Sequence, residues 1–264
     1  MAKIFCVANQ KGGVGKTTTS VNLSAGLAKL NQRVLLVDLD PQGNATMGAG
    51  INKAGLASSI YQVLLGESDV ASAKLRSEAG RFDVLPANRE LAGAEVEMVE
   101  LENRERRLKD ALAKVDADYD FILIDCPPAL SLLTLNGLVC AHGVIIPMQC
   151  EYYALEGLSS LVRTIDALKG RLNPALEIEG VLRTMFDVRN NLANAVSAEL
   201  TNHFGDLVFR TIIPRNVRLA EAPSHGQSIL GYDRASRGGV AYLGLAGEVL
   251  RRQREREQAG RSQL

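Results

Sequence analysis

Short, nearly continuous apolar runs recur along the chain, and segments with helical spacing of apolar residues separate them. These runs predict buried strands at residues 3–8, 33–38, 82–87, 121–125, 143–148, 178–185 and 208–214. Helices are predicted at residues 16–30, 88–114, 154–169, 190–203 and 236–257. Strands that are apolar along their whole length and alternate with helices are typical of a parallel sheet covered on both faces. The pattern therefore predicts a doubly wound, mostly parallel α/β fold.

The length and the even composition of the chain favour one domain. Its 264 residues suit a single large α/β unit, and no linker, repeat or low-complexity block divides them. We expect one domain over residues 1–264, with a polar tail from about residue 251. The charged stretch at residues 95–110 has helical spacing and predicts a solvated helix face. The apolar runs are too short to span a bilayer.

The charge balance limits how the chain could bind nucleic acid. Lysine and arginine total 30, as do aspartate and glutamate, so the formal net charge is zero. Any binding to DNA must therefore come from a local basic patch. The cysteines lack the CxxC spacing of a metal or redox site and are interpreted as small buried residues in a reducing compartment; they are Cys6, Cys126, Cys140 and Cys150.

The stretch NQKGGVGKTT lies between the first predicted strand and the first predicted helix. A glycine-rich turn that ends in Gly-Lys-Thr at such a junction indicates a phosphate-binding loop. Gly12, Gly13 and Gly15 let backbone N–H groups close around phosphate oxygens at the positive end of the helix. Lys16 would neutralise the β- and γ-phosphates, and the Thr17 hydroxyl would bind Mg²⁺.

Acidic residues follow two of the other predicted strands. Asp125 ends FILID, so we expect it at the carboxyl edge of the sheet, where ligands bind in open α/β folds. A carboxylate there fits Mg²⁺, held directly or through water, although it could also cap the turn before Pro127. Asp40, in VDLDPQGN, either initiates an Asp-Pro turn or orients the attacking water. Spacing alone leaves both alternatives open.

The motifs KGGVGKTT, LLVDLDPQGN, FILIDCPP and PRNVRLAEAPSHG occur in this order. Together they resemble the ParA/Soj-type chromosome and plasmid partition ATPases of the deviant Walker A group, which includes the MinD proteins. The likeness runs from residue 3 to about residue 250. It explains why Gln10 stands where the pattern G-x-x-x-x-G-K-[ST] has its first glycine, with Lys11 beside it. In this group the early lysine reaches the partner's phosphates across a nucleotide-sandwich dimer, as an arginine finger would.

The resemblance implies a role for each matching residue. Lys11, Lys16 and Asp40 form the implied catalytic set, in which Asp40 positions the hydrolytic water. Thr17 and Asp125 form the implied magnesium site. A side chain at Gly12 would block dimer formation and still allow nucleotide binding. The implied nucleotide-binding residues, of which the last three lie near the base, are Lys11, Gly12, Gly13, Val14, Gly15, Lys16, Thr17, Thr18, Met185, Pro214 and Asn216.

Members of the partition branch bind DNA without sequence preference, as ATP dimers. Arg189 and Arg218 match family positions that contact DNA. The further candidates are Arg183, Arg215, Arg234 and Arg237. A dimer would present such a patch twice, and contacts to phosphates would make binding dependent on salt.

The resemblance thus implies a Mg²⁺-dependent ATPase in the cytoplasm, associated with the nucleoid. Its ATP-bound homodimer would bind double-stranded DNA and leave it when a ParB-like centromere-binding protein stimulates hydrolysis, which would drive chromosome or plasmid segregation. The alternatives are a positioning ATPase for another cargo, a membrane-cycling regulator like MinD, and a small-substrate enzyme like dethiobiotin synthetase. The residues from Arg251 onward offer no apolar helix face to a membrane, which argues against the MinD-like alternative. Lys11 and the candidate DNA-binding arginines argue against a small-substrate enzyme like dethiobiotin synthetase.

Overall fold

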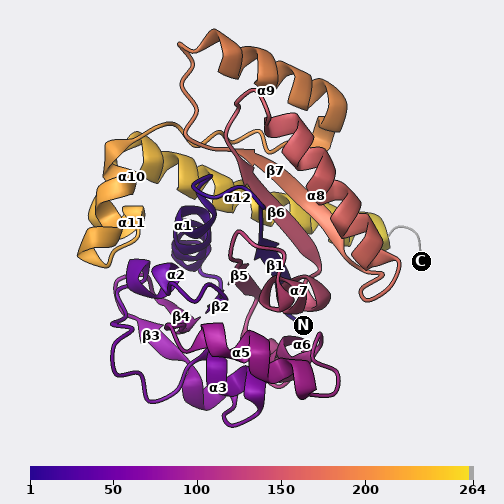
Figure 1. Ribbon diagram of the computed structural model, residues 1–264. Helices are drawn as coiled ribbons and strands as arrows, with labels where there is room; N and C mark the ends of the chain where they lie inside the picture. The colour runs from indigo at the N-terminus through magenta and orange to yellow at the C-terminus, as the bar shows by residue number, and fades with distance from the viewer. Residues whose placement is uncertain (262–264) are drawn as a thin grey trace.

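The computed structural model describes residues 1–261 and has a seven-stranded sheet at its centre (Figure 1). The strand order is β3-β4-β2-β5-β1-β6-β7, and every pair is parallel except β3 with β4. The strands are β1 (Lys3–Val7), β2 (Val34–Asp38), β3 (Leu75–Ser77), β4 (Phe82–Leu85), β5 (Phe121–Asp125), β6 (Gly143–Met148) and β7 (Glu177–Arg183). The predicted doubly wound, mostly parallel fold is confirmed.

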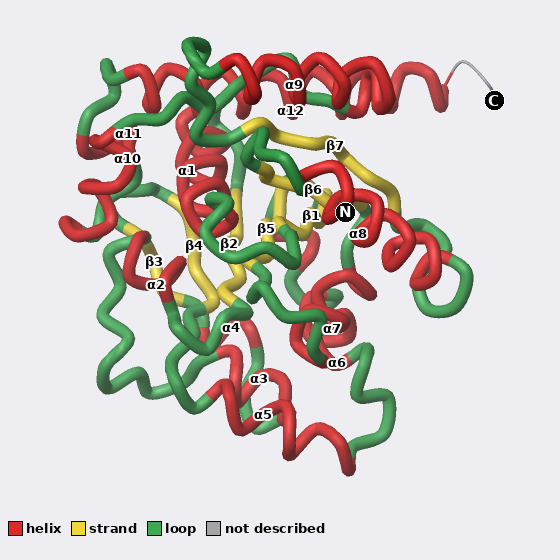
Figure 2. Tube along the Cα trace, turned by 45° about the horizontal axis from the view of Figure 1, so that its top comes forward, coloured by secondary structure: helices red, strands yellow, loops and turns green. Residues whose placement is uncertain are grey.

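Helices cover both faces of this sheet (Figure 2). They are α1 (Lys16–Lys29), α2 (Asn44–Gly48), α3 (Ile60–Leu65), α4 (Val70–Ala73), α5 (Leu91–Glu97), α6 (Arg107–Leu112), α7 (Leu132–Cys140), α8 (Ala154–Lys169), α9 (Asn191–Phe204), α10 (Val217–Glu221), α11 (Ile229–Tyr232) and α12 (Arg237–Arg261). The last of these continues through most of the expected polar tail, and residues 262–264 of that tail lie outside the described residues. None of the described helices has the length and apolar character needed to cross a membrane.

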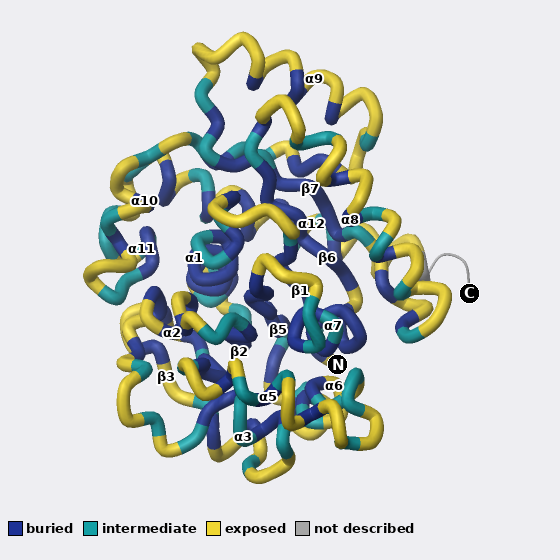
Figure 3. Tube along the Cα trace, viewed as in Figure 1, coloured by how far each residue is buried: buried dark blue, intermediate teal, exposed yellow. Residues whose placement is uncertain are grey.

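Two apolar cores lie on opposite sides of the sheet, and the strands between them are buried (Figure 3). On β5, Ile122 and Ile124 pack into the core beneath α3, α5, α6, α7 and α8. Phe121 and Leu123 pack into the other core, beneath α1, α11 and α12. Because successive side chains of a strand point to opposite faces, this double burial requires the continuous apolar runs seen in the sequence.

The predicted helix at residues 88–114 was wrong, because the chain forms two shorter helices, α5 and α6, there. Asn103 between them has a left-handed backbone with φ of 52°, which an α-helix does not contain. The buried side chain of Asn136 bridges one interrupted backbone pair at this break. It accepts from the N–H of Leu108 at 3.1 Å and donates to a carbonyl just ahead of α6 at 2.8 Å. The charged stretch at residues 95–110 is therefore not one helix face.

The predicted strand at residues 208–214 was also wrong. Only isolated bridges form there, between Val181 and Val208 and between Phe186 and Pro214. The segment runs along the sheet edge next to β7, but a side chain of α12 binds two of its N–H groups. Since those groups are occupied, no continuous ladder forms.

Candidate nucleotide-binding site

The loop between β1 and α1 is shaped by two glycines with left-handed backbones. Gly13 has φ of 73° and Gly15, the residue before α1, has φ of 90°. Side chains disfavour this conformation, so glycine is needed at both positions. No side chain caps the first turn of α1. Its free N–H groups and the positive end of the helix therefore face the loop, which is the arrangement that binds phosphate.

Lys16 is held at the centre of this loop. The residue is 7% exposed, and its ammonium donates to the carbonyl of Lys11 at 3.0 Å. Burial lowers the pKa of Lys16, against the opposing effect of Asp125. Thr184, after β7, closes the loop from the other side through a hydroxyl that donates to the carbonyl of Val14 at 2.8 Å. Gly12 lies at the exposed edge, where an added Cβ would meet nothing within 4 Å.

Asp125 is the last residue of β5 and is fully buried beneath the loop. Its carboxylate accepts hydrogen bonds from the hydroxyls of Thr17 and Ser20, each at 2.8 Å. Burial, with the charge of neighbouring Asp38, raises the pKa of Asp125 to about 8. A buried carboxylate beside a hydroxyl supplies the oxygen ligands that Mg²⁺ prefers, and a cation would offset the cost of burying its charge. Thr17 and Asp125 therefore have the chemistry that a magnesium site needs, and their role as ligands stays a prediction.

Asp38 is a buried residue to which the sequence analysis gave no role. It ends β2 and pairs in register with Asp125 on β5. Its carboxylate accepts from the N–H and the hydroxyl of Thr46, at 2.8 and 2.7 Å, while the same hydroxyl accepts from the N–H of Ala87. Burial raises the pKa of Asp38 to about 6. Its position two residues before Asp40 in VDLD was the signal that could have marked it.

Asp40 lies just beyond β2 and is partly exposed. Its N–H donates to Asp38 at 3.1 Å, and its carboxylate accepts from the N–H of Gln42 at 2.9 Å. It therefore makes the turn contact that the sequence allowed. One carboxylate oxygen makes that contact, so the geometry also leaves the role in orienting water open.

Lys11 does not reach back into its own loop. Its ammonium forms an ion pair with the carboxylate of Glu151, and both side chains are 51% exposed. Its N–H donates to Asn9, whose side-chain amide donates to the carbonyl of Pro147 at the end of β6. The backbone of Lys11 is therefore fixed to the sheet while its charge stays at the surface. Nothing in the sequence analysis singled out Glu151.

The residues assigned to the base line a cavity of about 330 Å³ beside the loop. Met185, Pro214 and Asn216 contribute to it, as do Gly15 and Thr18. Met185 has a left-handed backbone, with φ of 48°, and its sulfur accepts from the Gln149 side chain. The remaining lining residues could not be predicted from the sequence, and they are Thr184, Ile213, Arg215, Val217, Leu219, Ala220 and Tyr242. They come from three separate segments of the chain, so only the fold could gather them.

The candidate DNA-binding arginines have different surroundings. Arg189 is 86% exposed and pairs with Asp187 at 2.7 Å, while Arg218 is 54% exposed and pairs with Glu221 at 2.9 Å. The other exposed candidates are Arg215, Arg234 and Arg237. The bridge from Phe186 to Pro214 brings the loop that carries Arg189 close to Arg215.

Arg183 differs from the other candidates because its guanidinium is used inside the molecule. It donates to the hydroxyl of Ser197 at 2.9 Å and to the carbonyl of Phe209 at 2.8 Å. We therefore leave Arg183 out of the proposed DNA surface.

A glycine-rich loop that runs from a central parallel strand into the first helix, with a buried strand-end carboxylate on its threonine, defines a P-loop nucleotide hydrolase. A family model described as an AAA domain matches residues 2–178. The chain belongs to the ParA/Soj family of chromosome-partitioning ATPases.

The four cysteines are buried and unpaired, as predicted.

Three similar proteins illustrate this relationship. An uncharacterized protein of Pseudomonas putida is 62% identical over 96% of this chain and 97% of its own. The sporulation initiation inhibitor protein Soj of Bacillus subtilis is 55% identical over 94% of this chain and 98% of its own. The solved structure of cobyrinic acid a,c-diamide synthase from Mycobacterium smegmatis, with a bound ATP analogue and magnesium, is 40% identical, with a TM-score of 0.84 over 96% of both chains. The predicted family and ATPase class are confirmed, and the predicted cofactors, ATP and Mg²⁺, match what this relative binds.

Proposed function

We propose that this ATPase works as an ATP-dependent homodimer that binds DNA without sequence preference and leaves it after hydrolysis stimulated by a ParB-like protein. It would act in the cytoplasm, on the nucleoid, to segregate a chromosome or plasmid. The observation that carries the proposal is the position of Lys11. Its backbone is fixed beside the phosphate loop, but its ammonium is at the surface on Glu151. A second copy of the chain could receive that charge at its own nucleotide.

Each site residue would have its own role in ATP binding or hydrolysis. The loop N–H groups and Lys16 would hold the phosphates, and the cavity with Met185 and Pro214 would hold the base. Thr17 and Asp125 would hold Mg²⁺, which neutralises charge on the β- and γ-phosphates. Asp40 would orient the attacking water, and the partner's lysine would stabilise the charge that develops on the transferred group.

The DNA surface would consist of the exposed arginines Arg189, Arg215, Arg218, Arg234 and Arg237. Two of them are already paired with carboxylates, so DNA phosphates would have to compete with Asp187 and Glu221. One copy alone should therefore bind weakly. A dimer presents the surface twice, and the second contact then costs little additional entropy.

The test is DNA binding by Asp40→Ala, which is designed to trap the ATP dimer, on random-sequence duplex with ATP or ADP at two salt concentrations. We expect binding with ATP only, weaker at the higher salt. Arg189→Ala and Arg218→Ala should weaken it, whereas Arg163→Ala, an exposed arginine on α8, should not. A dimer that forms with ATP but does not bind DNA would overturn nucleoid tethering. Vesicle binding in its place would favour the MinD-like alternative.

A second candidate is an amide-forming enzyme, because the solved relative at 40% identity bears the name of a diamide synthase. The partition-named relatives are more similar, at 48–55% identity, which favours the first proposal. The two candidates differ in what accelerates ATP turnover. Stimulation by DNA together with a ParB-like protein supports partition, whereas stimulation by a small carboxylic acid with an ammonia donor supports amide formation.

A further inference from the structure

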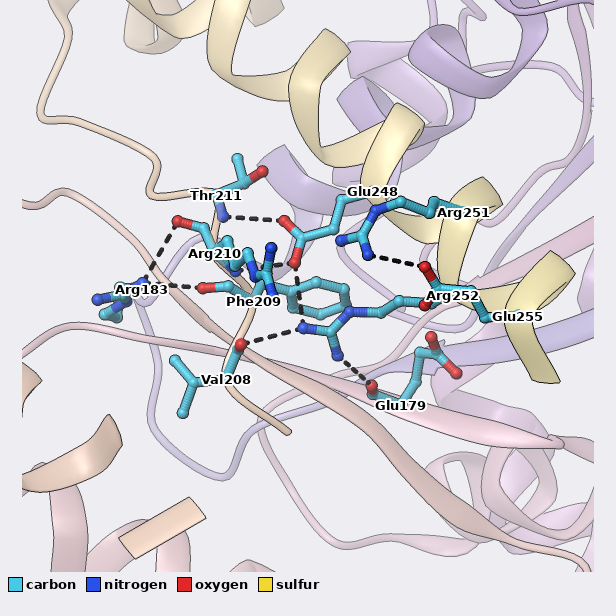
Figure 4. Close-up of polar contacts among 10 residues, drawn as sticks. All are labelled: Glu179, Arg183, Val208, Phe209, Arg210, Thr211, Glu248, Arg251, Arg252 and Glu255. Atoms are coloured by element: carbon cyan, nitrogen blue, oxygen red, sulfur yellow. Dashed lines mark hydrogen bonds and ion pairs between the residues drawn. The ribbon is translucent and has the colours of Figure 1, made fainter. Parts of the chain in front are cut away.

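We propose that Glu248 and Arg252 of α12 are positioning residues for the nucleotide base, although neither lines the cavity. This inference rests on the proposed binding of ATP in that cavity. The two side chains, called the α12 clasp below, fix the segment at residues 208–216, which supplies one wall. Figure 4 shows the clasp between α12 and this segment.

Glu248 holds the backbone of the segment directly. Its two carboxylate oxygens accept from the N–H groups of Arg210 and Thr211, at 2.8 and 2.9 Å. The side chain of Glu248 is only 6% exposed, so these bonds are shielded from water. They replace the strand pairing that the sequence predicted here, and they fix the segment by its main chain, whatever its side chains are.

Arg252 locks the carboxylate and the segment together. It donates to Glu248 at 3.1 Å and to the carbonyl of Val208 at 3.0 Å, and a third bond reaches the carbonyl of Glu179 on β7. Its guanidinium also lies 4.2 Å from the ring centre of Phe209. An arginine can make all these contacts at once because its donors are arranged in a planar fork.

Phe209 is also held in place by its packing against β7. It is fully buried, and Gly180 on β7 lies so close that an added Cβ would be 2.5 Å from the ring. Beyond this anchor, the N–H of Ile213 donates to the carbonyl of Arg183 at 2.9 Å. Ile213 and the next residues, Pro214, Arg215 and Asn216, then line the cavity. Only a few residues therefore separate the clasp contacts from the cavity lining, and hydrogen bonds hold this stretch on both sides.

The same helix also contributes a residue to the cavity lining. Tyr242, which lies six residues before Glu248 on α12, lines the cavity, and its hydroxyl is 3.1 Å from that of Thr19 on α1. One helix thus supplies part of the cavity lining and holds another part of it in place. The position of residues 213–216 relative to Tyr242 would therefore depend on the clasp, and a base binds more tightly when its cavity is fixed before binding.

The experiment compares Glu248→Gln with Glu255→Gln, the same change on the same helix at a residue that only pairs with exposed Arg251. Titration calorimetry with Mg²⁺ measures binding of ATP and of inorganic tripolyphosphate, which has no base. Glu248→Gln should raise the Kd for ATP at least about fivefold, the scale of one lost hydrogen bond. Its Kd for tripolyphosphate and its kcat at saturating ATP should equal those of Glu255→Gln.

Equal ATP affinity in the two variants would overturn the proposal, as would a parallel loss of tripolyphosphate binding. If Glu248→Gln does not fold, Arg252→Lys replaces it and is judged by the same two outcomes, since lysine keeps the charge but loses the fork. Wild-type protein that binds no ATP would instead overturn the proposed function.

Discussion

The ammonium of Lys11 lies against the carboxylate of Glu151, at the exposed edge of the phosphate loop. Both side chains are half exposed, and ion pairs of this kind contribute about 0–1 kcal/mol. An interaction this weak would allow the Lys11 ammonium to move to a nucleotide phosphate, as the proposed dimer requires.

Glu151→Gln should promote ATP-dependent dimer formation, because Lys11 no longer has to leave a carboxylate. The weakness of an exposed pair limits the gain to about fivefold in the dimer dissociation constant. The dimer dissociation constant is measured by light scattering as a function of protein concentration. The variants carry Asp40→Ala as well, and ATP is present. Glu156→Gln, at an exposed position on α8, is the matched control. Weaker dimerisation in Glu151→Gln would mean that Glu151 itself contacts the partner.

Lys16→Ala should strongly reduce ATP turnover, because the phosphates lose the buried cation of the loop. We expect kcat/KM to fall about 100-fold or more, the scale of a lost group that stabilises transition-state charge. Steady-state phosphate release measures this. Lys29→Ala, at an exposed position on the same helix, should retain full activity. A Lys16→Ala protein with wild-type turnover would refute the assigned mechanism.

Thr17→Val should raise the magnesium requirement, because it replaces the hydroxyl that lies 2.8 Å from Asp125 with a methyl group. The concentration of Mg²⁺ for half-maximal ATPase activity should rise about tenfold or more. Chelation with EDTA should stop the wild type, and added Mg²⁺ should restore it. Thr201→Val, at an exposed position on α9, serves as the control. An unchanged requirement would place the metal ligands elsewhere.

Asp83 should make the stability of the fold depend on pH. On β4 it accepts from Arg76 at 2.8 Å and from the Tyr119 hydroxyl at 2.7 Å. Burial acts to raise the pKa of Asp83, but these bonds and nearby Lys74 outweigh it and lower the pKa. Because the folded pKa is below the unfolded value, the stabilisation is full above the unfolded pKa and is lost as pH falls through the folded one.

Urea unfolding at pH 7 and below pH 4 tests this expectation. The wild type should lose stability on acidification, and Asp83→Asn should lose less, since its side chain does not titrate. Asp166→Asn, at an exposed aspartate on α8, should follow the wild type. Identical pH dependence in Asp83→Asn and the wild type would contradict the assignment.

The sequence predicted features that depend on neighbouring residues. The apolar runs predicted the central strands because a strand buried on both faces must be apolar at successive positions. The phosphate loop was recognisable because its glycines and Gly-Lys-Thr ending lie within a few residues between a strand and a helix, and the structure confirms left-handed backbones at Gly13 and Gly15. The position of Asp125 at the carboxyl edge of the sheet was also predictable from neighbouring residues, because Asp125 directly ends an apolar strand.

The tertiary structure decided features that depend on distant residues. The register between β2 and β5 sets Asp38 beside Asp125, and the base cavity combines Gly15 with Tyr242. The segment at residues 208–214 has the apolar pattern of a strand, but Glu248 binds its N–H groups. A hydrogen-bond donor takes whichever acceptor the fold brings to it, and local periodicity carries no information about an acceptor some 40 residues away.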